Sequence, residues 1–534
     1  MEEDIERRKS KLNKFFFGWI KDNYDKIFLV LLFLAFIIRI WIFFKTMNQP
    51  IWWDAGDYLS AAKRWAGLNP NMLDIWYYRR GFFWPLFGTI FFKTGLGEIG
   101  IRFFITLFST GIVAVSYFLI KKMFNKKLAL LTTLCLTFSW ILLFFSGRPL
   151  TNIPSAFFLL LFLLLFWKGY VLKEGDKFLY LSGIFYALAA LTRMQNLMFL
   201  IPIFIFIFSR EKFKFLKNKK LWITLGIFLL VMTPQLIIHY QHFGNPVADL
   251  MKYYLGIGGS QTGEIGAEIG QPSKLFSYIT NLPYMLDGNE KGYTTLFALS
   301  PIYILFVIGF FYFFIDLFLG FDKIFKDEKI QKRLFVLMWI VVIFILLGYI
   351  TIAVEQRYVM ETLPFLFLIA VFPLLKLGNF IKNKSKLSNK FIFASIAIVL
   401  MLLLIPNFLF GNNLIEAKKT SYLEVKQAGE WIKENSNLTD IVVTSSLPQI
   451  TYYSERIVYP FNLAYRRDLE EKNETDFNEF VLKNHPRYLV ISAYEVDYDW
   501  VFQYPEKHKN ILVPVKVYYK NEQPILVIYE FKYS

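Results

Sequence analysis

The chain has 534 residues, of which 55% are hydrophobic and 19% aromatic, and it carries a formal net charge of +17. Soluble globular proteins are less apolar and carry a larger charged fraction, so this composition excludes an ordinary soluble protein. The basic residues cluster in short loops between apolar runs, which is typical of membrane proteins, so the net charge gives no indication of nucleic-acid binding. The single cysteine, Cys135, excludes an internal disulfide.

Residues 1–26 are charged and amphipathic and show no small-residue cleavage site, so we expect a cytoplasmic N-terminal segment and not a signal peptide. Apolar runs of the length that membrane-spanning helices require then recur along the chain. They lie near 27–46, 101–120, 128–146, 153–170, 178–209, 221–240, 294–318, 334–354, 358–375 and 391–409.

The run at 178–209 is too long for a single span. At 1.5 Å per residue, about 30 residues form roughly 45 Å of helix, which exceeds a hydrocarbon core of about 30 Å. The polar sequence LTRMQN at 191–196 interrupts this run. We interpret the run as two short passes that meet at a hinge. The sequence therefore predicts a polytopic α-helical membrane protein with about eleven transmembrane helices.

Loop charge predicts the sidedness of the chain. With a cytoplasmic N-terminus and eleven spans, every strongly basic short loop falls on the inner side of a cell (plasma) membrane, as the positive-inside rule requires. Residues 27–410 then form a transmembrane domain with outer loops at 47–100 and 242–293. The glycine-rich stretch 256–270 is interpreted either as a lid over a cleft or as a plain flexible connector.

The tail, residues 411–534, lies outside the membrane in this arrangement. The sequence YLEVKQAGEWIKEN predicts an amphipathic helix, and DIVVTS, RYLVIS and PILVIYEF predict strands. About 120 residues are enough for an independent core, so we expect a small extracytoplasmic α/β domain.

Two carboxylates, Asp54 and Asp57, stand in the sequence WWDAGDYL just after the first apolar run. A carboxylate near a low-dielectric rim can act as a general base or bind a metal ion. Helical spacing places Asp54, Asp57 and Tyr58 on one face. We expect Asp54 and Asp57 to be the catalytic residues, and Trp53 and Tyr58 to line an acceptor pocket. The alternative is that Asp54 only caps the N-terminus of a helix.

Four arginines fall at the predicted outer openings of spans, namely Arg80, Arg148, Arg193 and Arg357, and Tyr358 follows the last of them. Guanidinium groups bind phosphate through paired hydrogen bonds. For Arg80 and Arg357 the alternative is snorkelling at the membrane interface. Arg193 stands where an apolar run is broken, which packing alone does not explain.

Three further polar residues lie near span ends. His239 and His242 close a span in HYQHFGNP, and they either line the pocket, join a metal site or serve as interfacial caps. Arg39 lies late in the first span, and we expect it to face the bundle interior.

A carboxylate pair and several arginines on one side of a membrane suit transfer from a lipid phosphate. The arginines would hold the phosphate leaving group, and an apolar groove between spans would hold the lipid tail. The carboxylate would deprotonate an acceptor hydroxyl or hold a divalent cation such as Mg or Mn.

The chain resembles the GT-C superfamily of membrane glycosyltransferases, nearest to dolichyl-phosphate-mannose–protein mannosyltransferases and aminoarabinose transferases. The resemblance covers residues 27–375 and depends on the order of several short landmarks. These are an arginine late in the first span, D-x-x-x-Y from Asp54, R-x-x-x-x-P-L-x-G-x-x-F from Arg80, RPLTNIPSAFFLLL, the LTRMQN hinge and QRYVMETLPFLFL.

This resemblance implies that a sugar moves from a polyprenyl (dolichyl or undecaprenyl) phosphate carrier to a protein, glycan or lipid acceptor at the outer membrane face. It implies that Asp54 is the catalytic residue, that Arg193 contacts the donor phosphate, and that Arg357 matches the R-Y pair of the family. Two departures, Ala55 and Asn152, stand where many members carry acidic residues and leave metal dependence open.

Two rival functions use the same features. A transporter or flippase of a lipid-linked or anionic substrate would need the same arginines and the same groove. A membrane anchor that presents the tail as a binding module would leave the polar residues unexplained. In every case membrane lipid is a partner and nucleic acid is not.

Overall fold

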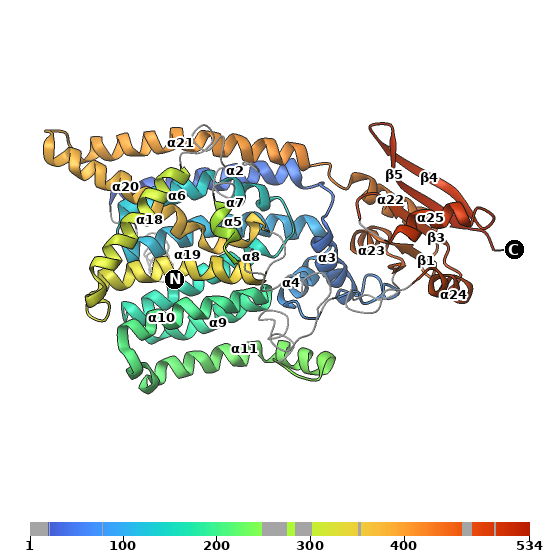
Figure 1. Ribbon diagram of the computed structural model, residues 1–534, viewed down its shortest axis with the longest axis horizontal. Helices are drawn as coiled ribbons and strands as arrows, with labels where there is room; N and C mark the ends of the chain where they lie inside the picture. The colour runs from blue at the N-terminus through green and yellow to red at the C-terminus, as the bar shows by residue number, and fades with distance from the viewer. Residues whose placement is uncertain are drawn as a thin grey trace, which may run out of the picture.

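The computed structural model describes residues 20, 22–76, 78–247, 275–282, 302–350, 354–461, 473–495 and 498–533. They form an elongated helical bundle with a smaller domain of helices and strands at one end (Figure 1). The glycine-rich stretch 256–270 and most of residues 1–26 lie outside the described residues, so the expectations for these two segments stay predictions.

The bundle is built from long apolar helices and a few short ones. They are α2 (Asn23–Thr46), α3 (Trp53–Trp65), α4 (Phe83–Lys93), α5 (Gly97–Met123), α6 (Lys126–Phe138), α7 (Trp140–Ser146), α8 (Asn152–Phe166), α9 (Asp176–Thr192), α10 (Leu200–Glu211), α11 (Lys219–Phe243), α15 (Ser277–Thr280), α18 (Ile302–Leu319), α19 (Glu328–Ile350), α20 (Leu363–Lys384) and α21 (Asn389–Lys418).

Within the described residues, eight helices are long and apolar enough to cross a membrane, and the bent pair α6–α7 makes nine. The predicted polytopic membrane protein is confirmed. The predicted break in the fifth apolar run is also present, because α9 ends at Thr192 and the 3₁₀ helix Met194–Phe199 separates it from α10. With 17 and 12 residues, α9 and α10 are each shorter than a full span. The count of eleven therefore stays a prediction.

Arg39 stabilises the bend between α6 and α7, whose axes differ by 51°. Its side chain is fully buried and donates hydrogen bonds to Ser109 Oγ (2.7 Å) and to the carbonyl oxygen of Leu136 (3.2 Å) near the end of α6. On the other side of the break, Asn407 Oδ1 accepts a hydrogen bond of 2.8 Å from the backbone N–H of Trp140. Polar groups released by a broken helix need such partners in an apolar surrounding. Arg39 thus faces the bundle interior, as expected.

The smaller domain contains a five-stranded mixed sheet in the order β2-β1-β3-β5-β4. Strands β2, β1 and β3 run parallel, whereas β5 is antiparallel to both β3 and β4. The elements of this domain are α22 (Leu423–Asn435), β1 (Ile441–Thr444), α23 (Leu447–Ser454), β2 (Ile457–Tyr459), α24 (Glu474–Asn484), β3 (Tyr488–Ser492), α25 (Asp499–Lys507), β4 (Leu512–Lys520) and β5 (Gln523–Phe531).

Alternating side chains along the strands bury both faces of this sheet. Val442 and Val490 pack in the core shared with α22 and α23, whereas Val443 and Leu489 pack in the core shared with α24 and α25. The predicted helix and all three predicted strands are present as α22, β1, β3 and β5. The expected small α/β domain is confirmed.

Candidate active site

Asp54 is held between two arginines that come from distant parts of the chain. Its Oδ1 lies 3.1 Å from Nη2 of Arg80, and its Oδ2 lies 2.8 Å from Nη1 of Arg357. Arg80 also reaches Asp57, with 3.0 Å between Nη1 and Oδ2, so one guanidinium bridges both carboxylates. The structure therefore brings together the two predicted carboxylates and two of the four predicted arginines.

The local fold of α3 explains how Asp54 is presented. The helix begins at Trp53 and Trp52 occupies the N-cap position, so Asp54 lies in the first turn and is not the cap. The capping interpretation is therefore wrong. The first turn still favours an anion, because the positive end of the helix dipole lies there. The Asp54 side chain keeps 28% of its surface exposed, which leaves room for a substrate to reach it.

The electrostatics of Asp54 combine two opposing effects. Burial alone would raise the pKa of this carboxyl group, but the positive charges of Arg80 and Arg357 and their hydrogen bonds outweigh it. The pKa of Asp54 is therefore held well below its usual value. Asp54 is ionised at neutral pH, which is the state that a general base requires.

Arg193 belongs to the same cluster through the ring of Tyr358. The guanidinium carbon of Arg193 lies 4.5 Å from the centre of this ring, and that of Arg357 lies 5.2 Å from it. Arg193 also lies 3.9 Å from Glu361, which is only 2% exposed. A crevice of about 10 Å³ runs beside Arg193, Tyr358 and Glu361.

The hinge that carries Arg193 is stabilised by side chains from the neighbouring helices. The backbone of Arg193 is extended (φ −154°, ψ 106°), which ends α9. Asn196 Nδ2 donates to the carbonyl oxygen of Ala189 (2.9 Å) and to Ser155 Oγ (2.7 Å), and Ser155 Oγ donates in turn to Glu361 Oε1 (3.2 Å). The break therefore has a fixed geometry in which its polar groups find partners.

Gln235 fixes the segment that carries Arg80. Its Nε2 donates to the carbonyl oxygens of Tyr78 (3.1 Å) and Arg80 (3.3 Å), and its Oε1 accepts from the backbone N–H of Phe82 (3.1 Å). The adjacent Gly81 packs so closely on the end of α9 that a Cβ atom there would overlap the carbonyl oxygen of Leu191. The loop of Arg80 is thereby held against the hinge.

Both predicted histidines lie beside this loop. His239 is fully buried, and its Nε2 lies 2.7 Å from Nε2 of Gln235. The ring of His242 stacks on that of Tyr78 with 3.6 Å between centroids. Their positions fit support of the Arg80 segment better than direct contact with Asp54.

Arg148 lies apart from this cluster. Its guanidinium is only 4% exposed and stacks on the ring of Trp52 at 3.5 Å and on that of Phe144 at 4.4 Å. Burial and the nearby charge of Arg102 lower its pKa. The assignment of Arg148 as a phosphate ligand stays a prediction.

The two aromatic residues predicted for an acceptor pocket point in different directions. Tyr58 is buried and lies beneath Arg80, with 5.4 Å between the guanidinium carbon and the ring centre. Trp53 packs against the core that α22 and α23 form in the smaller domain. Tyr58 therefore supports the cluster, whereas Trp53 joins α3 to the smaller domain.

Helix α23 of the smaller domain is seated directly on α3. A Cβ atom at Gly56 would lie 2.8 Å from the carbonyl carbon of Pro448, so the two helices touch through backbone. Lys63 Nζ donates to the carbonyl oxygen of Tyr452 (3.1 Å) and pairs with Glu455 (2.9 Å). At 100° per residue, Gly56 and Lys63 share the face of α3 opposite to Asp54. One face of α3 thus holds the smaller domain and the other presents the carboxylates.

The chain and its structure are similar to several known proteins. Residues 80–238 match the model of the dolichyl-phosphate-mannose-protein mannosyltransferase family, a segment that includes Arg80, Arg193 and Gln235. The structure is similar to that of ArnT from Cupriavidus metallidurans in the apo state, with a TM-score of 0.64, 11% identity and coverage of 94% of this chain and 97% of that chain. No curated protein sequence matches the chain.

The same ArnT bound to undecaprenyl phosphate gives a TM-score of 0.63 at 11% identity, again covering 94% and 97% of the two chains. The archaeal oligosaccharyltransferase AglB from Archaeoglobus fulgidus, in complex with an inhibitory peptide and a dolichol-phosphate, gives 0.57 at 15% identity and covers 88% of this chain and 70% of that chain. The chain shares the fold of ArnT and AglB, which is the GT-C fold. The resemblance seen in the sequence is therefore confirmed at the level of the fold.

Metal binding is not supported by the donor atoms that the structure describes around Asp54. Both oxygens of Asp54 face guanidinium groups, and Asp57 faces Arg80. Among the described residues, no three histidine, cysteine or acidic side chains lie close enough to hold a metal ion. The described residues of this site do not fit a divalent cation, and the chemistry proposed below uses side chains alone.

Two residues of this candidate site escaped the sequence analysis. Glu361 follows Arg357 by one helical turn in QRYVMETLP, and an acidic residue opening an apolar run was a usable signal. Gln235 stands four residues before His239 inside a span, so their shared helical face was a second signal.

Proposed function

We propose that the chain is a glycosyltransferase that moves a sugar from a polyprenyl phosphate to an acceptor at the membrane surface. The observation that carries this proposal is the clamp of Asp54 between Arg80 and Arg357, with Arg193 nearby, on a GT-C fold. A partly exposed carboxylate beside several guanidinium groups offers both functions that the reaction needs, a base for the acceptor and cations for the leaving phosphate.

In the proposed reaction, Asp54 takes the proton from the acceptor hydroxyl. The acceptor oxygen then forms a bond to the anomeric carbon of the sugar, and the bond from that carbon to the phosphate oxygen breaks. The electron pair leaves with the polyprenyl phosphate, which gains one negative charge. Arg357 and Arg193 stabilise this charge through hydrogen bonds that strengthen as it develops. Attack opposite to the leaving phosphate inverts the configuration of the sugar.

The arginines also couple donor binding to the basicity of Asp54. In the structure, Arg80 and Arg357 hold the pKa of Asp54 low, which makes this carboxylate a weak base. A donor phosphate that takes hydrogen bonds from Arg357 adds negative charge beside Asp54 and weakens the hold of the guanidinium. The pKa of Asp54 then rises, so the base gains strength when the donor is in place.

The orientation in the membrane follows from the same proposal. With the basic loops on the cytoplasmic side, the Asp54 cluster and the smaller domain face outward. The acceptor, whether protein, glycan or lipid, would then approach from outside, where the smaller domain stands over α3.

Transfer of labelled sugar from a polyprenyl phosphate donor by the purified protein tests this function. Asp54→Asn should abolish transfer and leave the protein folded, because Asn keeps the size of the side chain and loses the base. Asp440→Asn is the matched control, since Asp440 also pairs with an arginine (Arg487, 2.7 Å) but lies in the smaller domain. Movement of intact donor across vesicles that persists in Asp54→Asn, with no sugar transfer by either protein, would identify a flippase instead.

A further inference from the structure

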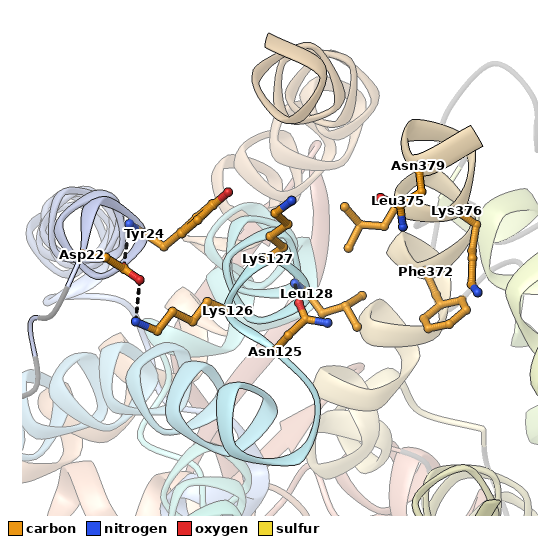
Figure 2. A pocket seen from close by; sticks show the side chains of 10 residues that line it. All are labelled: Asp22, Tyr24, Asn125, Lys126, Lys127, Leu128, Phe372, Leu375, Lys376 and Asn379. Carbon is orange, nitrogen blue, oxygen red and sulfur yellow. Dashed lines mark hydrogen bonds and ion pairs between the residues drawn. The ribbon is translucent and has the colours of Figure 1, made fainter. Parts of the chain in front are cut away.

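A pocket of about 570 Å³ opens at the far end of the bundle from Asp54, between α2, α6 and α20 (Figure 2). Helix α2 measures the separation, because Asp22 at its start lines the pocket, whereas Thr46 at its end lies beside Gln49 and the approach to α3. The 24 residues of α2 correspond to about 36 Å along its axis. The pocket therefore lies at the opposite membrane rim and is separate from the proposed donor site.

The lining of this pocket carries an excess of positive charge. Three lysines, Lys126, Lys127 and Lys376, face one carboxylate, that of Asp22. Lys126 neutralises the acidic side chains, since its Nζ lies 2.6 Å from Asp22 and 3.0 Å from the buried Asp25. In the part of the chain that the structure describes, no carboxylate lies within ion-pair distance of Lys127 or Lys376. Neither of these charges is neutralised by a carboxylate. Lys127 remains for a ligand, whereas the ammonium group of Lys376, at the edge of the pocket, also lies over the rings of Tyr312 and Phe372, 5.3 and 5.5 Å from their centres.

Backbone dipoles add to this positive field. Helix α6 begins at Lys126, and the side chain of its N-cap residue Asn125 accepts a hydrogen bond of 2.9 Å from the backbone N–H of Leu128. The start of a helix of 13 residues carries partial positive charge and favours an anion. Figure 2 shows Lys127 at this position, in the gap between Tyr24 of α2 and the residues of α20.

The rest of the lining is divided between polar and apolar side chains. Tyr24, Asn125 and Asn379 offer hydrogen-bonding groups, whereas the remaining lining residues are the apolar Leu128, Phe372 and Leu375. Helices α2 and α20, and α6 together with α7, are long and apolar enough to cross a membrane, which places the pocket at the level where lipid headgroups meet acyl chains. A small soluble anion would use the lysines and leave the apolar side chains without a partner.

We propose that this pocket binds an anionic glycerophospholipid. The lipid phosphate lies beside Lys127 and the start of α6, with Lys376 at the edge, and the glycerol and the first acyl carbons lie against Leu128, Phe372 and Leu375. Basic pockets between transmembrane helices are suited to such headgroups. This binding does not depend on the proposed glycosyltransfer, since it takes place at the other rim of the bundle.

The test compares the full-length protein in nanodiscs of phosphatidylcholine with and without phosphatidylglycerol. Phosphatidylglycerol should raise the thermal unfolding temperature, and native mass spectrometry should show it retained in preference to phosphatidylcholine. In Lys127→Gln/Lys376→Gln this preference should fall by about 10- to 30-fold, since each lysine near a membrane surface contributes about 1 kcal/mol. Lys127→Arg, which keeps the charge, should retain the preference, and the single glutamine variants serve if the double variant does not fold.

The control pair is Lys382→Gln/Lys384→Gln, which removes the same charge from the last turn of α20 outside the pocket. It should keep the preference for phosphatidylglycerol. Equal losses in both pairs would show a general surface effect and overturn the proposal, as would a wild-type protein without any preference. Stabilisation by inorganic phosphate alone would assign the pocket to a soluble anion, and selective retention of undecaprenyl phosphate would assign it to the carrier lipid; both outcomes contradict a phospholipid site.

Discussion

The carboxylate of Asp54 and the guanidinium of Arg357 lie 2.8 Å apart although 303 residues separate them in the chain. This pair joins α3 to the 3₁₀ helix Gln356–Thr362 that precedes α20, and Arg80 completes the clamp from the other side of the carboxylate. The relationship defines the proposed site, because the group that would activate the acceptor and a group that would hold the phosphate touch each other before any substrate arrives.

Two substitutions of Arg357 should distinguish the contribution of its charge to activity from the contribution of its planar shape. Arg357→Lys keeps a cation but loses the planar guanidinium that contacts Asp54 and Glu355 together, so we expect kcat/KM for the donor to fall about 10- to 100-fold. In Arg357→Gln, kcat/KM for the donor should fall further, because this substitution also removes the positive charge. Steady-state kinetics with labelled donor measure both. Arg487→Lys, at the ion pair in the smaller domain, is the control and should leave kcat/KM within about twofold.

The pH dependence of activity should differ between the free enzyme and the donor complex. In the free enzyme the pKa of Asp54 is lowered from its usual value of 3.8, so this carboxyl group is deprotonated at any pH above that value. We therefore expect kcat/KM to stay level down to mildly acidic pH. In the complex the phosphate shares the arginines and the pKa of Asp54 rises, so the acidic fall in kcat should begin at a higher pH. Profiles of both constants in nanodiscs check this order, and the reverse order would contradict the proposed coupling.

Gln235→Leu should affect both stability and donor use. It removes hydrogen bonds to the backbone of Tyr78, Arg80 and Phe82 and leaves those partly buried groups without this partner, which should lower the free energy of unfolding by about 2–4 kcal/mol. The loosened Arg80 segment should also raise KM for the donor.

Gln331→Leu provides the matched control for Gln235→Leu. Gln331 is likewise buried in a span and donates to the carbonyl oxygens of Ser209 and Ile324 (both 3.1 Å), away from the cluster. It should lose similar stability in thermal unfolding and keep the KM of the wild type. A higher KM in both variants would mean that stability alone explains the effect.

Gly81→Ala should weaken activity through one methyl group. The new Cβ would overlap the carbonyl oxygen of Leu191 at the end of α9, so the Arg80 loop must move away from the hinge of Arg193. We expect kcat to fall at least about tenfold, since small displacements of catalytic groups have effects of this size. In Gly226→Ala, by contrast, the added Cβ of α11 meets open space, and this helix should be unchanged or slightly more stable. Equal activity of the two variants would contradict a close fit at Gly81.

Local sequence signals predicted the elements whose causes are local. The polar LTRMQN stretch located the helix break, and alternating apolar residues located β1, β3 and β5. The edge strand β4 was missed, because Pro514 interrupts its pattern beside an irregularity in the register. Sequence reasoning also grouped Asp54 with Arg357, because charged side chains at the ends of membrane spans tend to pair with one another or to line a polar cavity.

Contacts between distant segments were beyond that reasoning. From the sequence, Arg80 and Arg148 were both predicted to bind the donor phosphate. In the structure Arg80 bridges two carboxylates, whereas Arg148 stacks on Trp52. The difference arises because the local backbone directs each side chain toward different neighbours. The direct seating of α23 on α3 depends on the absence of a side chain at Gly56, and no pattern within either segment reveals the partner.

The contact between α23 and α3 connects the smaller domain to the helix that carries Asp54. Gly56 touches Pro448 on one side of a rigid rod only 13 residues long, and Asp54 projects from the other side. Under the function proposed above, a tilt of the smaller domain would move α3 and Asp54 with it. Contact of an acceptor with that domain would then be coupled to the position of the proposed base.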